Sequence, residues 1–177
     1  MTRTANAADA RLRKLAEGIA ALTKKDGLVL ERAREIADMR NAAAAEIYAL
    51  CAEFAAGLNR LLAQAEVRLD PPESSVVEFW DGAPCLIQIN VRGRILQIEY
   101  ESTAELVSTE EFRIPYTLAG SVRAFNQELL EKDLIEEQLI FFTLEKHRRM
   151  WRFFDPRTYR SGPLDQEYLV TLMEQLI

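Results

Sequence analysis

One pattern of apolar positions dominates the first third of the chain. Apolar side chains recur there at alternating spacings of three and four residues, in a single heptad register that runs from residue 12 to residue 61. This spacing predicts a long helix with one apolar stripe, here called the seam, which the helix cannot bury by itself and which must pack on another surface. The seam residues that we expect to bind a partner are Leu12, Leu15, Ile19, Leu22, Val29, Ile36, Ile47, Leu50, Phe54 and Leu61.

The helical arm is expected to cover residues 1–70 and to end at Pro71-Pro72, because proline lacks the backbone N–H and disfavours helix at the residue before it. Two alternatives stay open inside the arm. Two lysines followed by Asp26-Gly27 are typical of a helix C-terminus, which slightly favours a break there. The unchanged heptad phase on both sides favours a continuous helix, since one glycine costs only about 1 kcal/mol relative to alanine.

From Leu30 onward the apolar stripe becomes three positions wide. A stripe of that width is typical of a helix that lies on a bundle or a sheet. We therefore expect the second half of the arm to pack on its own C-terminal domain, on a symmetry mate, or on both. Asp26 and Arg40 occupy seam positions, where a polar residue either fixes the register at some cost in stability or marks a stretch of the seam that is open to water, and the second alternative is favoured.

Residues 71–177 are predicted to form an α+β domain, because short runs alternate between apolar and polar side chains as in a half-buried antiparallel sheet. The fold class is therefore α+β, with a long, coiled-coil-like helical arm followed by an antiparallel sheet of about six strands covered by helices. The expected elements are strands over 76–80, 85–91, 95–101 and 111–116, a helix over 118–132, a hairpin of strands over 139–145 and 150–154, and a last helix from Pro163.

This order of elements, together with the acidity of the chain, resembles that of the small chaperones of type III secretion. The resemblance implies a dimer that binds extended segments of other proteins. It rests on element order and charge alone, so it assigns no role to any residue.

Charge is distributed unevenly along a chain of net charge −6. Residues 71–145 carry 5 basic and 14 acidic side chains, and such an acidic body repels nucleic acid. Residues 146–160 carry 6 basic side chains and 1 acidic one, interleaved with aromatic rings. This segment is either a structural hairpin, a protein contact, or a surface for nucleic acid or another polyanion. Its candidate binding residues are Arg148, Arg149, Trp151, Arg152, Arg157 and Arg160.

No catalytic motif stands out. His147, the single histidine, lies in a basic turn, and a single histidine excludes metal sites built on several histidines. Cys51 and Cys85 are expected to act as small apolar residues of the fold. We therefore predict no catalytic residue, no metal and no cofactor. An enzyme without a recognisable motif would need a cleft that joins Glu99 and Glu101 to His147 or Tyr100.

The sequence thus predicts a non-catalytic interaction or scaffold protein, chaperone-like, that self-associates or binds a protein partner through its arm as a homodimer or higher oligomer. The alternatives are nucleic-acid or polyanion binding through residues 146–160, and an enzyme of unrecognised class. No apolar run approaches the roughly 20 residues that cross a bilayer. We expect no membrane contact and a cytoplasmic location.

Overall fold

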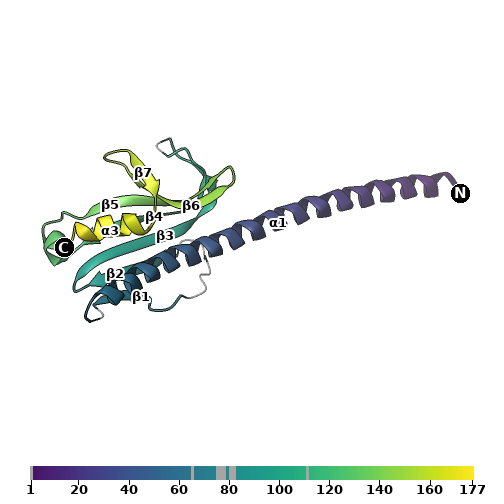
Figure 1. The fold of residues 1–177 in the computed structure, drawn as a ribbon. Coiled ribbons are helices and arrows are strands. Elements are labelled where there is room, and N and C mark those ends of the chain that lie inside the picture. Colours follow the sequence, from purple (N-terminus) through teal and green to yellow (C-terminus); the bar gives the residue numbers. More distant parts are fainter. Residues whose placement is uncertain (1, 65, 75–78, 80–82, 111) are drawn as a thin grey trace. The chain divides into compact units, whose positions relative to one another are not determined.

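A single long helix, α1 (Thr2–Leu61), opens the chain (Figure 1). The computed structural model describes residues 2–64, 66–74, 79, 83–110 and 112–177. The break favoured at Asp26-Gly27 is wrong, because α1 continues through both residues. A methyl group at Gly27 would meet nothing within 4 Å, so no close contact requires a glycine there. The cost of one glycine is small enough for the surrounding alanine-rich helix to offset.

Residues 1–39 and residues 40–177 form two compact units, and each is described here by itself. We call them the N-terminal unit and the sheet unit. The sheet unit begins inside α1 and not at Pro71, because Ala43, Ile47 and Cys51 already lie in its core. It also includes the short strand after α1, which is tied to the helix end by Asn59. The amide nitrogen of Asn59 donates to the carbonyl oxygen of Val67 at 2.9 Å.

The described residues of the sheet unit form one antiparallel sheet of seven strands in sequential order. The predicted class, α+β with a long N-terminal helix and an antiparallel sheet, is confirmed, with more strands than the six or so expected. The predicted strand over 76–80 lies outside the described residues except for Phe79. The strands are β1 (Val67–Asp70), β2 (Cys85–Val91), β3 (Arg94–Val107), β4 (Tyr116–Phe125), β5 (Glu136–Glu145), β6 (Arg148–Asp155) and β7 (Arg160–Pro163).

The helix predicted over 118–132 is wrong. Most of that segment is the central strand β4, and only α2 (Gln127–Glu131) is helical, with the side chain of Asn126 as its N-cap. The spacing of the apolar residues fits a helix or a strand. The segment forms a strand because it pairs with β3 on one side and with β5 on the other. The strand predicted over 111–116 is also wrong, since among its described residues only Tyr116 is in a strand. The helical arm does not extend over residues 1–70, because α1 ends at Leu61 and residues 67–70 form the outer strand β1. The last helix does not begin at Pro163, which lies in the other outer strand, β7.

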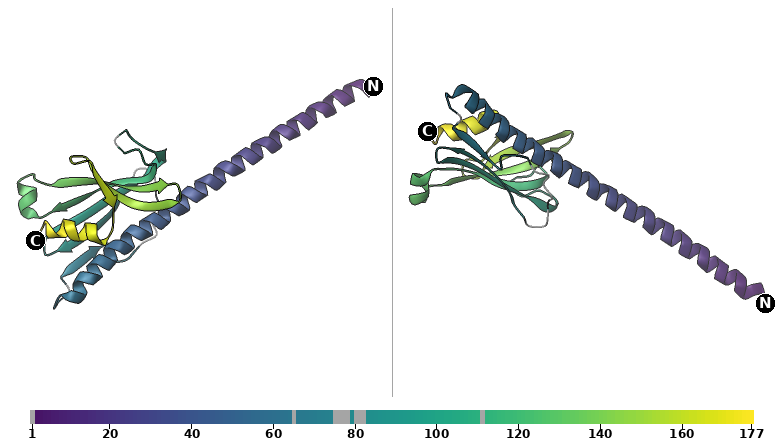
Figure 2. Two further views of the ribbon diagram at one scale, coloured as in Figure 1. Left: turned by 45° about the horizontal axis from the view of Figure 1, so that its top comes forward. Right: turned by 90° about the horizontal axis from the view of Figure 1, so that it is seen from below.

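The inner face of the sheet carries the core. Ile89, Leu96 and Ile98 are buried there as the alternation of β2 and β3 predicts. Residues 40–61 of α1 and the last helix, α3 (Gln166–Glu174), lie on this face (Figure 2). The indole nitrogen of Trp151 donates to the carbonyl oxygen of Ala43 at 2.9 Å, which fastens α1 to the sheet.

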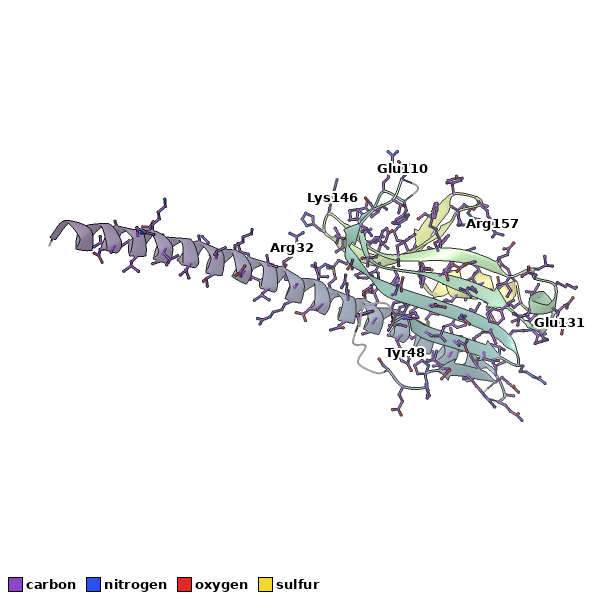
Figure 3. The ribbon with its side chains drawn as sticks, turned by 180° about the vertical axis from the view of Figure 1, so that it is seen from behind. Arg32, Tyr48, Glu110, Glu131, Lys146 and Arg157 are labelled. Carbon is purple, nitrogen blue, oxygen red and sulfur yellow. The ribbon has the colours of Figure 1, made fainter. Side chains whose placement is uncertain are left out.

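The outer face holds a second, smaller core of aromatic rings. Phe112, Tyr116, Phe141 and Phe154 are buried together, with the rings of Phe112 and Phe141 stacked at a centroid distance of 4.4 Å. Around this cluster the face is polar, as the wet face of an antiparallel sheet usually is. Figure 3 views the chain from behind and labels Glu110 and Lys146 beside two connections of the sheet unit.

Candidate functional site: the apolar seam of the first helix

The seam of the N-terminal unit is a row of large apolar side chains in contact with water. Five of its residues are between 56% and 63% exposed in this chain. An ordinary folded chain scatters such residues singly, whereas a contiguous exposed row is typical of an interaction surface. These residues, the exposed seam from here on, are Leu12, Leu15, Ile19, Leu22 and Val29.

The seam residues of the sheet unit have a different environment. Ile47 and Phe54 are buried in the core of the unit, and Leu50 is half-buried. Of the other two predicted seam residues, Ile36 is half-buried, whereas Leu61, at the end of α1, is 85% exposed. Partner binding by Ile47 and Phe54 is wrong, because both pack within their own chain, which is one of the surfaces expected for the second half of the arm. Only the exposed seam is left as a long stripe for a partner.

Arg40 shows why the sheet unit begins where it does. It occupies a seam position, and its Nε donates a hydrogen bond to the hydroxyl of Thr117 at 2.9 Å. A terminal guanidinium nitrogen of Arg40 donates to the carbonyl oxygen of Thr103. A charged side chain in the stripe is thus satisfied by strands β3 and β4, and its role is internal to the sheet unit.

A shallow apolar hollow of about 470 Å³ lies along the exposed seam. It forms where Gly18 leaves a gap among larger neighbours, and it is lined chiefly by Leu15, Ile19 and Leu22. Its seven lining residues also include Lys14, Ala21 and Lys25. Four of the seven, Leu15, Gly18, Ile19 and Leu22, have the spacing of a group that receives a side chain from a facing helix.

The two flanks of the exposed seam differ in charge. Counting by heptads, one flank, here called the basic flank, carries Arg11, Gly18, Lys25 and Arg32. Arg32 is labelled on α1 in Figure 3. The opposite flank carries Asp9, Ala16, Thr23 and Leu30.

The basic segment over 146–160 is largely part of the fold. Trp151 is buried against Tyr100 at a ring centroid distance of 5.2 Å, so its ring is not available to stack on a base. Arg157 forms an ion pair with Glu136 at 2.6 Å. Arg152 is half-buried, while the remaining candidates Arg148, Arg149 and Arg160 are exposed on β6 and β7. The structure does not gather the six candidates into one aromatic and basic surface.

The turn between β6 and β7 is built on a carboxylate of low pKa. The Asp155 carboxylate accepts hydrogen bonds from the backbone N–H of Arg157 at 3.0 Å and from the hydroxyl of Thr158 at 2.9 Å. These bonds, that of the backbone N–H first, lower the pKa of Asp155. A hydrogen bond from the Arg157 guanidinium likewise lowers the pKa of Glu136.

We expect Arg157→Gln to destabilise the sheet unit at neutral pH and to have little effect in acid. A carboxylate whose pKa is lowered by folding stabilises the fold above its unfolded pKa, and this stabilisation is lost as the pH falls through the folded pKa. Urea unfolding at about pH 7 and at about pH 3 measures the free energy of unfolding of the variant and of the wild type under the two conditions. Arg160→Gln, which removes an exposed charge from the adjacent strand, is the control. An equal loss of stability for Arg157→Gln at both pH values would contradict this role of the ion pair.

The residues considered for an unrecognised enzyme are brought together only in part. Glu99, Tyr100 and Glu101 line one shallow hollow of about 500 Å³ on the outer face, whereas His147 lines a separate hollow at the turn between β5 and β6. The ring of Tyr100 packs against Trp151 on the inner face. Burial raises the pKa of the Cys51 thiol to about 12. Among the described residues, no group of three or more His, Cys, Asp or Glu could hold a metal ion.

Comparisons with known proteins find no matching family, no matching curated protein and no matching solved structure. Within the described part of the chain, no helix is long and apolar enough to cross a membrane.

Proposed function

We propose that the protein is a non-catalytic interaction protein that uses the exposed seam to associate with itself or with a partner protein. The observation that carries the proposal is the row of five large apolar side chains, each more than half exposed, at the two seam positions of successive heptads. Two such positions per heptad form the stripe that helices bury against one another.

Burial of this row gives association its driving force. Covering a side chain of the size of leucine or isoleucine contributes roughly 1.5–3 kcal/mol, and somewhat less where part of it is already covered. The N-terminal unit also gains helical stability, because a helix with no packing partner is marginal in water. Association through the seam would therefore order the helix as well as shield it.

The proposal is tested by sedimentation of the full chain and by affinity capture, both compared with the double variant Leu15→Glu/Leu22→Glu. We expect the wild-type chain either to sediment as an oligomer at tens of micromolar or to retain a protein that the double variant does not retain. A chain that stays monomeric up to about 100 µM, a concentration at which interfaces of micromolar affinity are largely assembled, and that retains nothing in a seam-dependent way would overturn the proposal.

A further inference from the structure

We infer that the exposed seam is covered by a second copy of this chain, with the two N-terminal units parallel and in register. The inference rests on the proposed function, that the seam binds, and it names the occupant and its orientation. Three features of the N-terminal unit carry it: the hollow beside Gly18, the unequal flanks of the seam, and Asp26 within the seam.

The hollow lies where a parallel copy would insert a side chain. In a parallel in-register pair, an apolar residue of one helix inserts among four residues of the facing helix. For Ile19 of the other copy these four are Leu15, Gly18, Ile19 and Leu22, which are among the residues that line the hollow. A β-branched residue at this position, with leucine at the seam positions on either side of it, favours two strands over three or four.

The flanks decide between the two orientations. Antiparallel helices set each flank against the same flank of the other helix, whereas parallel helices set each flank against the opposite one. In an antiparallel pair, Leu12 of one helix can lie opposite Leu22, Val29 or Ile36 of the other. In each of these registers two cations of the basic flank lie side by side, because that flank carries no acidic residue. A like-charge juxtaposition of this kind disfavours the pairing.

The parallel register avoids these contacts. It sets Arg11, Lys25 and Arg32 of the basic flank against uncharged residues of the other copy, five positions further along the chain. Lys25 then faces Leu30, whose side chain is 60% exposed in the single chain. The methylene stem of a lysine can cover such a side chain while its ammonium group extends to water or to a neighbouring carboxylate.

Asp26, a polar residue within the seam, favours the in-register pairing. It occupies a seam position, so a parallel in-register pair places Asp26 of both copies in one layer. Lys25 of each copy is next to this layer, on the flank that faces Asp26 of the other copy. Two reciprocal pairs of opposite charge then offset the repulsion between the carboxylates, and a polar residue at a single seam position selects the register in which its partners meet.

Disulfide cross-linking of Leu22→Cys tests the orientation. In the parallel in-register pair the two introduced thiols face each other across the seam, so a small approach of the helices brings their Cβ atoms to the separation of about 4 Å that a disulfide needs. We expect mild oxidation to join most of this variant into covalent dimers. Wild type measures the background from Cys51 and Cys85, and Leu28→Cys is the matched control, because Leu28 is as exposed as Leu22 but lies off the seam.

Exchange of two charges tests the register independently. We expect Asp26→Lys alone, and Lys25→Glu alone, to weaken dimerisation by about tenfold or more, since each places like charges side by side at the seam. The double variant Lys25→Glu/Asp26→Lys restores opposite charges across the pair and should regain most of the lost affinity. Sedimentation equilibrium of the full-length variants supplies the dissociation constants.

The outcomes separate this inference from the proposed function. A mass of two chains, a cross-link at Leu22→Cys and rescue by the double exchange support the parallel pair. A mass of three or more chains, a cross-link only in mixtures of Leu12→Cys with Leu22→Cys, or absence of rescue overturns it. A monomeric chain that nevertheless captures a protein through the seam overturns the second copy as occupant, while the proposed function stands.

Discussion

Replacing Leu15 and Leu22 together by glutamate should weaken association through the exposed seam by at least about a hundredfold. Each substitution removes an apolar side chain worth roughly 1.5–3 kcal/mol when covered, and it puts a charge where water is excluded. Since a hundredfold corresponds to about 2.7 kcal/mol, loss of these contacts is sufficient for the effect. Sedimentation equilibrium measures the change in the dissociation constant for self-association. Titration with the captured protein measures the same change for a partner.

Leu28→Glu is the matched control for this change. Leu28 is 60% exposed, as Leu15 and Leu22 are, but it lies off the seam of α1. Glutamate favours helix about as well as leucine, so the double variant and the control should both keep the helix content of the wild type. Equal weakening by the control and by the double variant would show that general surface hydrophobicity, and not the seam, drives association.

Gly120→Ala should destabilise the sheet unit by about 3 kcal/mol or more, the upper end of the usual cost of overpacking. A Cβ atom at Gly120 would lie 1.9 Å from the carbonyl oxygen of Glu99 and 2.6 Å from the Cα of Tyr100. Both neighbours are backbone atoms of the adjacent strand β3, so they cannot move without disturbing the pairing of β3 and β4. Urea unfolding followed by tryptophan fluorescence measures the loss.

Gly57→Ala makes the same chemical change where there is room. Its Cβ would meet only the end of the Arg60 side chain, at 3.9 Å. Alanine is the better helix former, and we expect the sheet unit to gain up to about 1 kcal/mol. If Gly120→Ala unfolded at the same urea concentration as Gly57→Ala, the close approach of β3 and β4 would be wrong.

The sequence predicts an element well where its pattern of apolar and polar residues fits only one type of secondary structure. Strand β2 has the predicted bounds, 85–91, because its strict alternation fits a half-buried strand and no helix. The segment 118–132 was misassigned because Val122, Phe125 and Leu129 also fit the spacing of a helix. Its true state depends on pairing with β3 and β5, which lie outside the segment, and on Gly120, whose missing Cβ allows the strands to approach.

The sequence likewise predicts one part of the candidate site and leaves another part open. The heptad spacing identified the seam residues, and the wider stripe from Leu30 onward indicated a larger packing surface, but the pattern left open whether that surface belongs to this chain or to another copy. Ile47 and Phe54 share the register of Leu15 and Leu22, and only the sheet distinguishes them by burying the first two. The boundary between the two environments lies near Arg40, whose hydrogen bonds to Thr103 and Thr117 join residues more than sixty positions apart. No local pattern encodes such a contact.

The rate at which a maleimide labels Leu15→Cys, relative to Leu28→Cys, measures most directly whether water reaches the row in solution. Both parent side chains are 60% exposed in the isolated chain, so the two thiols should react alike when the protein is dilute. If another surface shields the row, labelling at Leu15→Cys slows at least about tenfold at high protein concentration or in native extract, while Leu28→Cys stays fast, because a covered thiol reacts only from the dissociated state. Equal rates at both positions under every condition would contradict the account.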